Sequence, residues 1–269
     1  MNKKLFVFDI DGTLLPVGDS SIPASAVEAI NKLLKEGHAI AINSGRPYGG
    51  IKPFLDAFIP GEKFAIAANG AALYEEDGRL INEETMPLTI LHYFHKRFQG
   101  EGKDIYAYAT TNRLYLYGPK VSSWAQWEIN ENHMEHYDDL NVDPLPLETK
   151  ILKVMVCGPK EWIPVVPFTS EEKKQFHIVV TGDEYLEILP AHVDKAHPIH
   201  ELCNRLGISE NDVYTFGDSG NDIGMLKEYH GVAMGESTPE AKEAAEFFTK
   251  PSYEDGIAYA LKSVLKVIR

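Results

Sequence analysis

The chain has 269 residues, of which 44% are hydrophobic and 25% charged, a composition typical of a folded globular protein with one large domain or two smaller ones. Its formal net charge of −14 at pH 7 provides no bulk attraction to nucleic acid or to an anionic membrane, so we expect neither as a partner. The two cysteines, Cys157 and Cys203, are too few and too far apart for a disulfide framework or a zinc motif, and we expect two buried thiols.

The amino-terminal segment opens like a secretion signal, but its apolar run, Leu5–Phe8, stops at Asp9 and is much shorter than the hydrophobic region of such a signal. No later segment approaches the roughly 20 uncharged residues that a membrane-spanning helix needs. We therefore expect a cytoplasmic protein.

At the start of the chain, short apolar runs alternate with helical patterns. The pattern Pro23–Glu36 predicts a helix, with a proline in its first turn and Gly37 after its end. The runs predict strands that are buried on both faces of a sheet, at Leu5–Phe8, Ala39–Ile42 and Phe64–Ala68. This β-α-β-α-β order predicts an α/β fold with a doubly wound parallel sheet and right-handed crossovers.

The pattern changes after about residue 82. Ile105–Tyr108 and Leu114–Tyr117 flank a turn near Asn112 and predict a hairpin. Further strands are expected at Leu152–Cys157, Phe176–Val180 and Tyr185–Leu189, and helices at about Leu88–Phe98 and Ser122–His133. We interpret this region as a second, α+β unit inserted into the first.

The first pattern returns near residue 195. A helix is expected at Ile199–Leu206, strands at Val213–Phe216 and Val232–Met234, and a carboxyl-terminal helix at Gly256–Val267. The chain therefore completes the first unit after the insertion.

Polar residues follow the predicted core strands, at Asp9 and Asp11, Ser44, Asn69 and Asp218. In open α/β sheets, ligands bind at the carboxyl ends of the strands. We therefore expect these side chains to converge on one crevice.

The segment Asp9–Thr13, with the sequence DIDGT, is the sharpest of these signals. Residues i and i+2 of a strand point to the same side, so its two carboxylates repel each other unless a cation or a proton intervenes. Gly12 and Thr13 leave backbone N–H groups that can face an anion. The segment could also be a plain acidic turn. A calcium loop would need further acidic ligands ending in a glutamate, and these do not follow Asp11.

The segment 217–222, with the sequence GDSGND, is the second signal. Its carboxylates, Asp218 and Asp222, can complete an oxygen-ligand site for Mg²⁺, although alone the segment could be a glycine-rich turn with a helix cap. Ser44 is weaker by itself, because Ser-Gly-Arg after a strand is often a cap. Even as a cap it would lie where a helix N-terminus binds phosphate.

Taken together, these segments resemble the motifs of the haloacid dehalogenase superfamily of phosphohydrolases, in particular its Cof-like branch with a type IIB cap. The matching segments are Asp9–Thr13, Asn43–Arg46, a lysine at Lys195, 217–222, Asn69–Ala71, Gly231–Gly235 and Asp255–Ala258. The resemblance spans nearly the whole chain. It implies a Rossmann-like doubly wound core formed by residues 1–82 and 189–269, with residues 83–188 as an inserted α/β cap that sets substrate specificity.

The resemblance also implies a mechanism. Asp9 would be the nucleophile that forms an aspartyl-phosphate, and Asp11 would protonate the leaving oxygen and then deprotonate the attacking water. Mg²⁺ would be held by Asp9, the Asp11 backbone carbonyl and Asp218, with Asp222 acting through water or by orienting its neighbours. Phosphate and substrate contacts would come from Gly12, Ser44, Gly45, Arg46, Asn69, Lys195 and Asn221. Arg46 and Asn69 could equally fix the loops around Ser44.

Two residues depart from the pattern of that branch. Asn43 stands where a threonine is common, and we expect it to have little effect. Ala196 follows Lys195 in place of the usual glycine, so the phosphate-binding lysine has rivals in Lys150 and Lys153. These two lie in or beside a predicted cap strand, where we expect them to face solvent.

These observations predict a Mg²⁺-dependent phosphatase that acts on small phosphorylated metabolites, such as sugar phosphates, as a monomer or weak homodimer. A sugar phosphomutase or other phosphotransferase would use the same intermediate and differ only in its acceptor. A non-catalytic metabolite-binding protein is a third interpretation, which the presence of Asp9, Asp11 and Asp218 disfavours.

Overall fold

The computed structural model describes residues 2–100, 102–118 and 122–268. The chain forms two compact units. The first unit comprises the chain up to Gly45, residues 51–81 and the chain from Asp194 onward, and the second comprises residues 46–50 and 82–193. The chain therefore leaves the first unit twice, once for a few residues and once for a long insertion.

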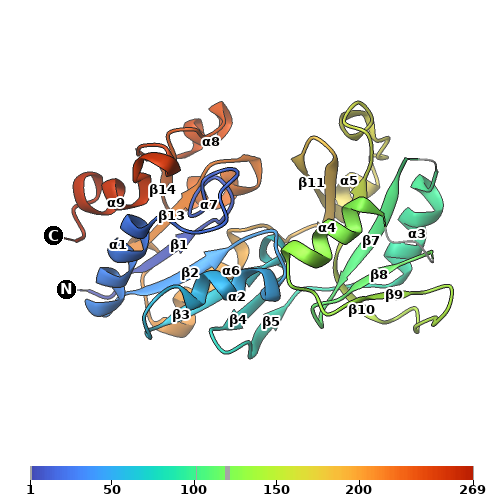
Figure 1. Cartoon of the computed structure of the whole chain (residues 1–269), viewed down its shortest axis with the longest axis horizontal. Helices are drawn as coiled ribbons and strands as arrows, with labels where there is room; N and C mark the ends of the chain where they lie inside the picture. Colours follow the sequence, from blue (N-terminus) through green and yellow to red (C-terminus); the bar gives the residue numbers. More distant parts are fainter. Residues whose placement is uncertain (1, 101, 119–121, 269) are drawn as a thin grey trace. The chain divides into compact units, whose positions relative to one another are not determined.

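The first unit is built on a sheet whose central strands are parallel (Figure 1). Among the described residues its strand order is β15-β14-β13-β1-β2-β3-β4-β5. Neighbouring strands from β15 to β3 are parallel, whereas β4 runs antiparallel to β3. The strands are β1 (Leu5–Phe8), β2 (Ala39–Asn43), β3 (Lys63–Ala67), β4 (Ala72–Glu75), β5 (Leu80–Glu83), β13 (Val213–Gly217), β14 (His230–Ala233) and β15 (Phe247–Phe248).

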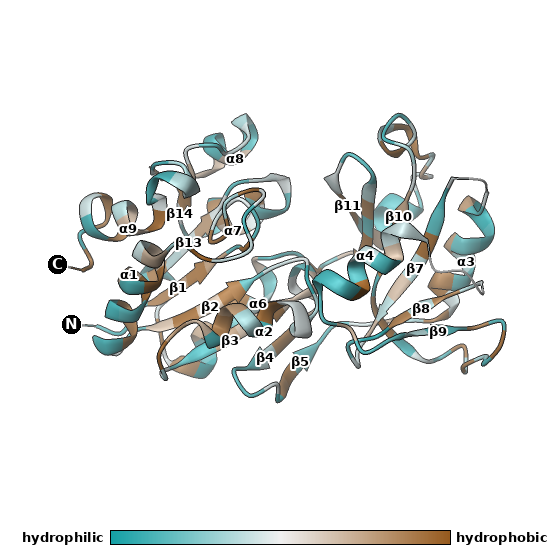
Figure 2. Cartoon of the chain, in the orientation of Figure 1, coloured by the Kyte–Doolittle hydropathy of each residue, from teal (hydrophilic) through white to brown (hydrophobic). Residues whose placement is uncertain are grey.

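The central strand β1 is buried on both faces, as its uninterrupted apolar sequence predicts. Successive side chains of a strand alternate between the two faces. Leu5 and Val7 therefore pack in the cluster that contains Ile199, whereas Phe6 stacks on Tyr214 of the neighbouring strand. Figure 2 shows this hydrophobic centre in brown. The residue that follows β1 thus emerges at the middle of the sheet edge.

Helices flank this sheet (Figure 1). They are α1 (Ala24–Lys35), α2 (Tyr48–Asp56), α6 (His197–Leu206), α7 (Ile223–Glu228), α8 (Pro239–Ala244) and α9 (Gly256–Tyr259), with short turns η1 (Ala68–Gly70), η3 (Glu210–Asp212), η4 (Gly220–Asp222) and η5 (Ser252–Glu254). The prediction of one helix over Gly256–Val267 is wrong in its extent. After α9 the chain makes a π-helical turn, η6 (Ala260–Val264), in which the Leu265 N–H bonds to the Ala260 carbonyl at 2.8 Å.

Strands β4 and β5 are present in the structure in addition to the predicted strands of this unit. They add an edge to the parallel sheet beyond β3. The turn between them contains Asp77 and Gly78, a pair typical of hairpin turns, so a local signal was present.

The second unit has its own sheet, with the order β11-β12-β10-β7-β8-β9 among the described residues and β6 paired with β10. The predicted hairpin is confirmed, because Tyr106 lies opposite Leu116 in the antiparallel pair β7 and β8. The elements are β6 (Met86–Pro87), α3 (Thr89–Phe98), β7 (Asp104–Ala109), β8 (Leu114–Leu116), α4 (Ser123–Glu131), β9 (Tyr137–Asp139), β10 (Lys150–Cys157), η2 (Ile163–Val165), α5 (Glu172–Gln175), β11 (Phe176–Gly182) and β12 (Tyr185–Pro190).

The structure corrects one expectation about this sheet. Lys150 faces solvent, with 64% of its side chain exposed, but Lys153 is buried with only 1% exposed. The Lys153 Nζ lies 2.6 Å from Glu187 Oε2 and 4.3 Å from the centre of the Tyr108 ring. The expectation failed because β10 lies between β7 and β12 and is covered on both faces, so Ile151 and every later residue of the strand is buried.

Two further expectations can be compared with the structure. Cys157 and Cys203 are both buried free thiols, as predicted. Among the residues that the structure describes, every helix is too short or too polar to cross a membrane.

Candidate active site

The strand ends of the first unit bring most of the predicted site residues to one edge of the sheet. Asp9, Ser44 and Asp218 follow β1, β2 and β13, which are adjacent and parallel. Asn69 follows β3, the next strand along. Asp9 and Ser44 are almost fully buried, at 5% and 2% exposed. Residues that are distant in sequence therefore meet because parallel strands end on the same side.

A buried ion cluster occupies this edge. The Lys195 Nζ donates to Asp9 Oδ1 at 2.6 Å and to Asp222 Oδ1 at 2.7 Å. Burial raises the pKa of Asp9 well above its usual range, although the Lys195 ammonium opposes the shift. Burial alone would lower the pKa of Lys195, but the Asp222 and Asp9 carboxylates raise it above its usual value. The lysine is therefore a fixed positive charge in direct contact with Asp9.

Asp218 completes the cluster from the end of β13. The Thr13 hydroxyl donates to Asp218 Oδ1 at 3.3 Å. Burial and the Asp222 carboxylate raise the pKa of Asp218 to about 7. Gly12 has a φ of +85°, and a Cβ added there would lie 2.5 Å from Asp218 Oδ2. The DIDGT segment therefore needs glycine at this position so that its backbone can approach the second carboxylate.

Asp222 organises the loop that carries Asp218. Its Oδ2 accepts hydrogen bonds from the Asp218 and Ser219 amides, both at 3.0 Å, while its Oδ1 bonds to Lys195. The side chain is completely buried. A single carboxylate thus connects Lys195 to the backbone of the GDSGND segment.

Asn69 and Asn221 form a second polar link along the same edge. The Asn221 Nδ2 donates to Asn69 Oδ1 at 3.0 Å, and the Ser219 hydroxyl donates to Asn221 Oδ1 at 2.7 Å. Ala68 and Asn69 have φ values of 51° and 55°, a left-handed conformation that costs free energy for residues other than glycine. Strain of this kind is concentrated at functional sites, which is consistent with a role for this turn.

Asp11 and Arg46 complete the set of predicted residues. The Asp11 side chain is exposed, and it does not belong to the group of carboxylates that lie together. Arg46 belongs to the second unit, where its Nη1 donates to the Glu131 carbonyl at 3.5 Å. Gly45 is the last residue of the first unit before that short excursion.

Sequence reasoning missed the residues that hold the Lys195 turn. Asp194 Oδ1 accepts hydrogen bonds from the Ala196 and His197 amides, both at 2.9 Å, and so caps the start of α6. An aspartate just ahead of a helix was a usable signal. No local pattern indicated that the Asn43 side chain would reach the Lys195 carbonyl, at 2.7 Å.

The three buried or half-buried carboxylates suit a metal ion. Oxygen atoms of Asp9, Asp218 and Asp222 all lie within 4.8 Å of one another. The raised pKa values of Asp9 and Asp218 show that burial and mutual repulsion disfavour their charged forms. A hard divalent cation prefers oxygen ligands and would relieve that repulsion, so these residues fit such an ion.

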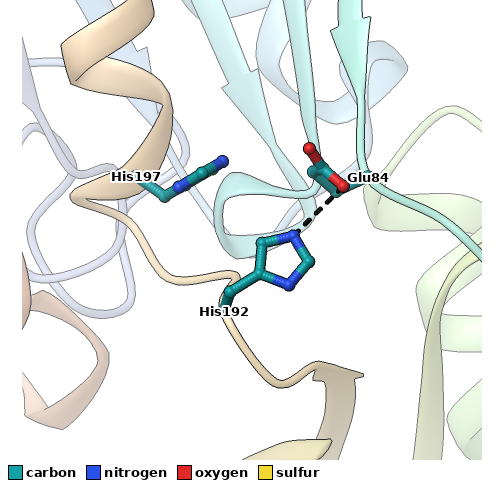
Figure 3. Close-up of side chains that lie close together, drawn as sticks. All are labelled: Glu84, His192 and His197. Carbon is teal, nitrogen blue, oxygen red and sulfur yellow. Dashed lines mark hydrogen bonds and ion pairs between the residues drawn. The ribbon is translucent and has the colours of Figure 1, made fainter.

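A separate pair of side chains joins the two segments through which the chain enters and leaves the second unit. Glu84 Oε2 lies 3.1 Å from His192 Nε2, and both side chains are partly exposed (Figure 3). His197, which Figure 3 also labels, belongs to the first unit. Ion pairs exposed to water contribute little to stability, and we assign this pair no part in the chemistry.

Comparison with known proteins decides the family. A family model described as haloacid dehalogenase-like hydrolase matches residues 6–261. The chain belongs to this family. It is 32% identical to YkrA of Bacillus subtilis (strain 168) over 269 aligned residues, which cover 98% of each protein.

A second relative and a solved structure are also similar to this chain over nearly its whole length. The chain is 28% identical to the 5-amino-6-(5-phospho-D-ribitylamino)uracil phosphatase YwtE of Bacillus subtilis, with 97% of this chain and 98% of YwtE covered. The crystal structure of a haloacid dehalogenase-like hydrolase from Bacteroides thetaiotaomicron has a TM-score of 0.83 at 24% identity, with 98% of this chain and all of that chain covered. The family and fold class predicted from the motifs are confirmed.

Proposed function

We propose that this haloacid dehalogenase-like hydrolase is a phosphatase that cleaves phosphate monoesters of small metabolites, with Asp9 as its nucleophile. The observation that carries the proposal is the buried cluster in which Lys195 contacts Asp9 and Asp222, with Asp218 beside them. The name of the relative YwtE, a phosphatase, supports the reaction class.

The residues divide the chemistry into two steps. In the first, an Asp9 oxygen forms a bond to phosphorus while the ester oxygen leaves and takes a proton from Asp11. In the second, Asp11 takes a proton from a water molecule, whose oxygen displaces Asp9 from phosphorus and releases inorganic phosphate. The first step leaves Asp11 as a carboxylate, and the second returns its proton, so Asp11 ends the cycle as it began. Lys195 and Ser44, both buried, would hold the phosphate oxygens.

We further propose Mg²⁺ as the cofactor. Asp9, Asp218 and the Asp11 backbone carbonyl would hold it, and Asp222, whose oxygens already bond to Lys195 and to backbone amides, would act mainly by orienting these groups. When bound, the ion supplies positive charge that screens the repulsion between the nucleophile and the phosphate dianion.

For the substrate we propose sugar or sugar-alcohol phosphates. The name of YwtE gives that relative a phosphorylated ribityl compound, which supports this class. We propose that residues 1–82 and 189–269 act as the catalytic core and that residues 83–188 act as a cap that selects the substrate. Gly12, Gly45, Asn69, Asn221 and Arg46 remain proposed contacts of the phosphate or substrate.

The test is release of inorganic phosphate by the purified protein. With Mg²⁺ present, we expect release from p-nitrophenyl phosphate and from members of a panel of phosphorylated sugars and sugar alcohols, and loss of release with excess chelator. The Asp9→Asn variant is the control for contaminating phosphatases. Absence of release from every substrate contradicts the proposal. Isomerised sugar phosphate without free phosphate would identify a phosphomutase instead.

A further inference from the structure

Asn43 is a fully buried polar residue that contacts the backbone of Lys195 in the candidate site. Its side chain has no part in the proposed chemistry. It ends β2 directly before Ser44 and is 0% exposed. Its Nδ2 donates to the Lys195 carbonyl at 2.7 Å, across 152 positions of sequence. The orientation of the amide follows from this contact, because a carbonyl only accepts. The sequence led us to expect little from this residue.

The Lys195 carbonyl needs a donor from outside its own helix. In a regular α-helix the donor to this carbonyl would be the amide of Ile199, four residues later. That amide bonds to the Ala196 carbonyl instead, at 3.0 Å. Pro198, just before it, has no N–H to offer. The Asn43 amide therefore supplies a hydrogen bond that helix α6 does not.

The rest of the turn is held just as closely. The Asp194 carboxylate satisfies the amides of Ala196 and His197. A Cβ added at Gly70 would lie 2.0 Å from the Asp194 carbonyl oxygen, so the turn 68–70 packs directly against this backbone. Asp194 thus holds the amides of this turn, and Gly70 packs against its backbone. The hydrogen bond from Asn43 holds the Lys195 carbonyl.

The surroundings of Asn43 Oδ1 indicate that an asparagine is present here for the hydrogen bond that its Nδ2 donates. Among the residues that the structure describes, Asn43 Oδ1 has no hydrogen-bond partner. Burying an unpartnered amide oxygen is unfavourable, and an apolar side chain of the same size would avoid that cost. The hydrogen bond that Asn43 Nδ2 donates to the Lys195 carbonyl offsets this unfavourable burial.

We propose that Asn43 is a positioning residue that holds the Lys195 backbone, so that its Nζ reaches Asp9 and Asp222 at 2.6 and 2.7 Å. The proposal rests on the proposed function, in which Lys195 binds the phosphate. The Lys195 side chain is buried and contacts two carboxylates at once, so a shift of its backbone would move the ammonium away from at least one of them. Charge-stabilising groups act strongly only when they are held in place before the reaction.

The experiment is a double-mutant cycle between Asn43→Leu and Lys195→Met, measured as kcat/KM and as the inhibition constant of inorganic phosphate. Asn43→Leu keeps the size of the side chain and removes its donor. We expect it to lower kcat/KM and to weaken inhibition by phosphate, each about tenfold, the effect of one buried hydrogen bond. In the Lys195→Met background the same substitution should change either quantity by less than about twofold, because its target is gone.

The matched control is Thr215→Val. Thr215 is also fully buried on a central strand, and its hydroxyl donates to a backbone carbonyl, that of Met225, at 2.9 Å. We expect it to lower Tm by an amount similar to Asn43→Leu and to leave kcat/KM unchanged. Asn43→Ala, which removes the donor without placing an apolar branch beside the carbonyl, carries the same expectation as Asn43→Leu and serves if the leucine variant does not fold.

The outcomes separate the two proposals. Full activity of Lys195→Met would remove that lysine from the proposed mechanism, whatever Asn43 does. If Lys195→Met loses activity while both Asn43 variants keep normal kcat/KM, the positioning role alone is overturned. An equal loss from Asn43→Leu with and without Lys195 would also overturn it, because Asn43 would then act by another route.

Discussion

Each unit of the molecule buries a lysine among carboxylates, but the two clusters differ in composition. In the first unit, Lys195 contacts Asp9 and Asp222, and Asp218 lies in the same group. Three carboxylates thus face one ammonium. Burial and neighbouring carboxylates raise the pKa of Asp9 and of Asp218. This cluster has a surplus of negative charge that a cation would neutralise.

In the second unit, Lys153 pairs with Glu187 at 2.6 Å, and its ammonium lies over the Tyr108 ring. The other carboxylate, Glu128, accepts hydrogen bonds from the Tyr108 hydroxyl and from Asn132 Nδ2, the latter at 2.6 Å. Burial raises the pKa of Glu128. Here two carboxylates face one ammonium, and the second of them, Glu128, is also bonded by uncharged donors.

The difference teaches that a buried lysine and carboxylates do not by themselves mark a reactive site. A hydrogen-bonded cluster of the second kind can be a structural feature, whereas the carboxylate-rich cluster at the carboxyl ends of parallel strands fits a cation, which we propose to be Mg²⁺. We therefore expect changes in the first cluster to alter catalysis and changes in the second to alter stability.

The largest effect is expected from Asp9→Asn. The amide is nearly isosteric with the carboxylate but is a poor nucleophile, so kcat should fall at least about a thousandfold while the fold is retained. Phosphate release and circular dichroism measure the two properties. Asp11→Asn should also be severe, and Asp19→Asn, at an exposed position, should be normal. More than a few per cent of residual activity in Asp9→Asn would show that Asp9 is not the nucleophile.

The lysines give the most direct contrast between the clusters. Lys195→Met should lower kcat/KM at least about a hundredfold, as expected for loss of one buried charge-stabilising group. Lys153→Met should leave the activity of the folded protein nearly normal but lower its unfolding free energy by about 3 kcal/mol, because the Lys153 ammonium no longer offsets the burial of the Glu187 carboxylate.

Lys150→Met, at an exposed position of the same strand as Lys153, is the matched control and should change neither property. Steady-state kinetics and thermal unfolding of the three variants test the contrast. The reverse ordering, with Lys153→Met inactive and Lys195→Met active, would move the phosphate-binding cation into the second unit.

Mg²⁺ should raise the thermal stability of the protein through the first cluster and not through the second. At about 100 times its dissociation constant, an ion that binds only the folded protein adds about 2.7 kcal/mol, which corresponds to an increase in Tm of about 5 °C. Asp218→Ala should abolish this increase and Glu128→Gln should preserve it. A metal-free protein that melts at the same temperature as the Mg²⁺ form would argue against the site.

The pKa of Asp218 adds a pH dependence to that measurement. Its pKa is raised from 3.8 to about 7, so the folded state binds the proton more tightly than the unfolded state does. The stability of the metal-free protein should therefore decrease as the pH rises through this interval. The increase in Tm with Mg²⁺ should accordingly be larger at about pH 8 than at about pH 6.

The smallest effect is expected at His200, which also contacts carboxylates but is exposed to solvent, unlike the two buried lysines. Its ring nitrogens lie 2.8 Å from Glu210 and 2.7 Å from Glu228, and the hydrogen bond that the ring donates to Glu210 is the largest of the effects that raise its pKa. A raised pKa means that the stabilisation is complete below the unfolded value of 6.5 and is lost as the pH rises through the folded value.

Because 40% of the His200 side chain is exposed, we expect the pair to contribute only about 0.5 kcal/mol. His200→Gln should flatten the pH dependence of unfolding above pH 6.5 and leave kcat/KM unchanged. An effect of several kcal/mol would show that exposure is a poor guide to the strength of these pairs.

The sequence predicted the parallel core and the strand-end clusters because both depend on local patterns. An apolar run such as Leu5–Phe8 indicates a strand buried on both faces, and the polar residue that follows it must lie at the carboxyl end of that strand. The motifs around Asp9 and Asp218 then identified the family. The hairpin of β4 and β5 also has a local signal, the turn pair Asp77 and Gly78.

Other features depended on contacts between distant segments and could not be read locally. Lys153 has the same sequence signature as a solvent-facing strand residue, and only the strands on either side of β10 bury it. Asn43 looked like a neutral replacement until the fold placed it against a carbonyl 152 positions away. Sequence alone determined which residues stand at strand ends, because the periodicity of a strand is local. Tertiary structure decided which buried charges are balanced and which backbone groups find a donor, because those depend on partners that only the folded chain brings together.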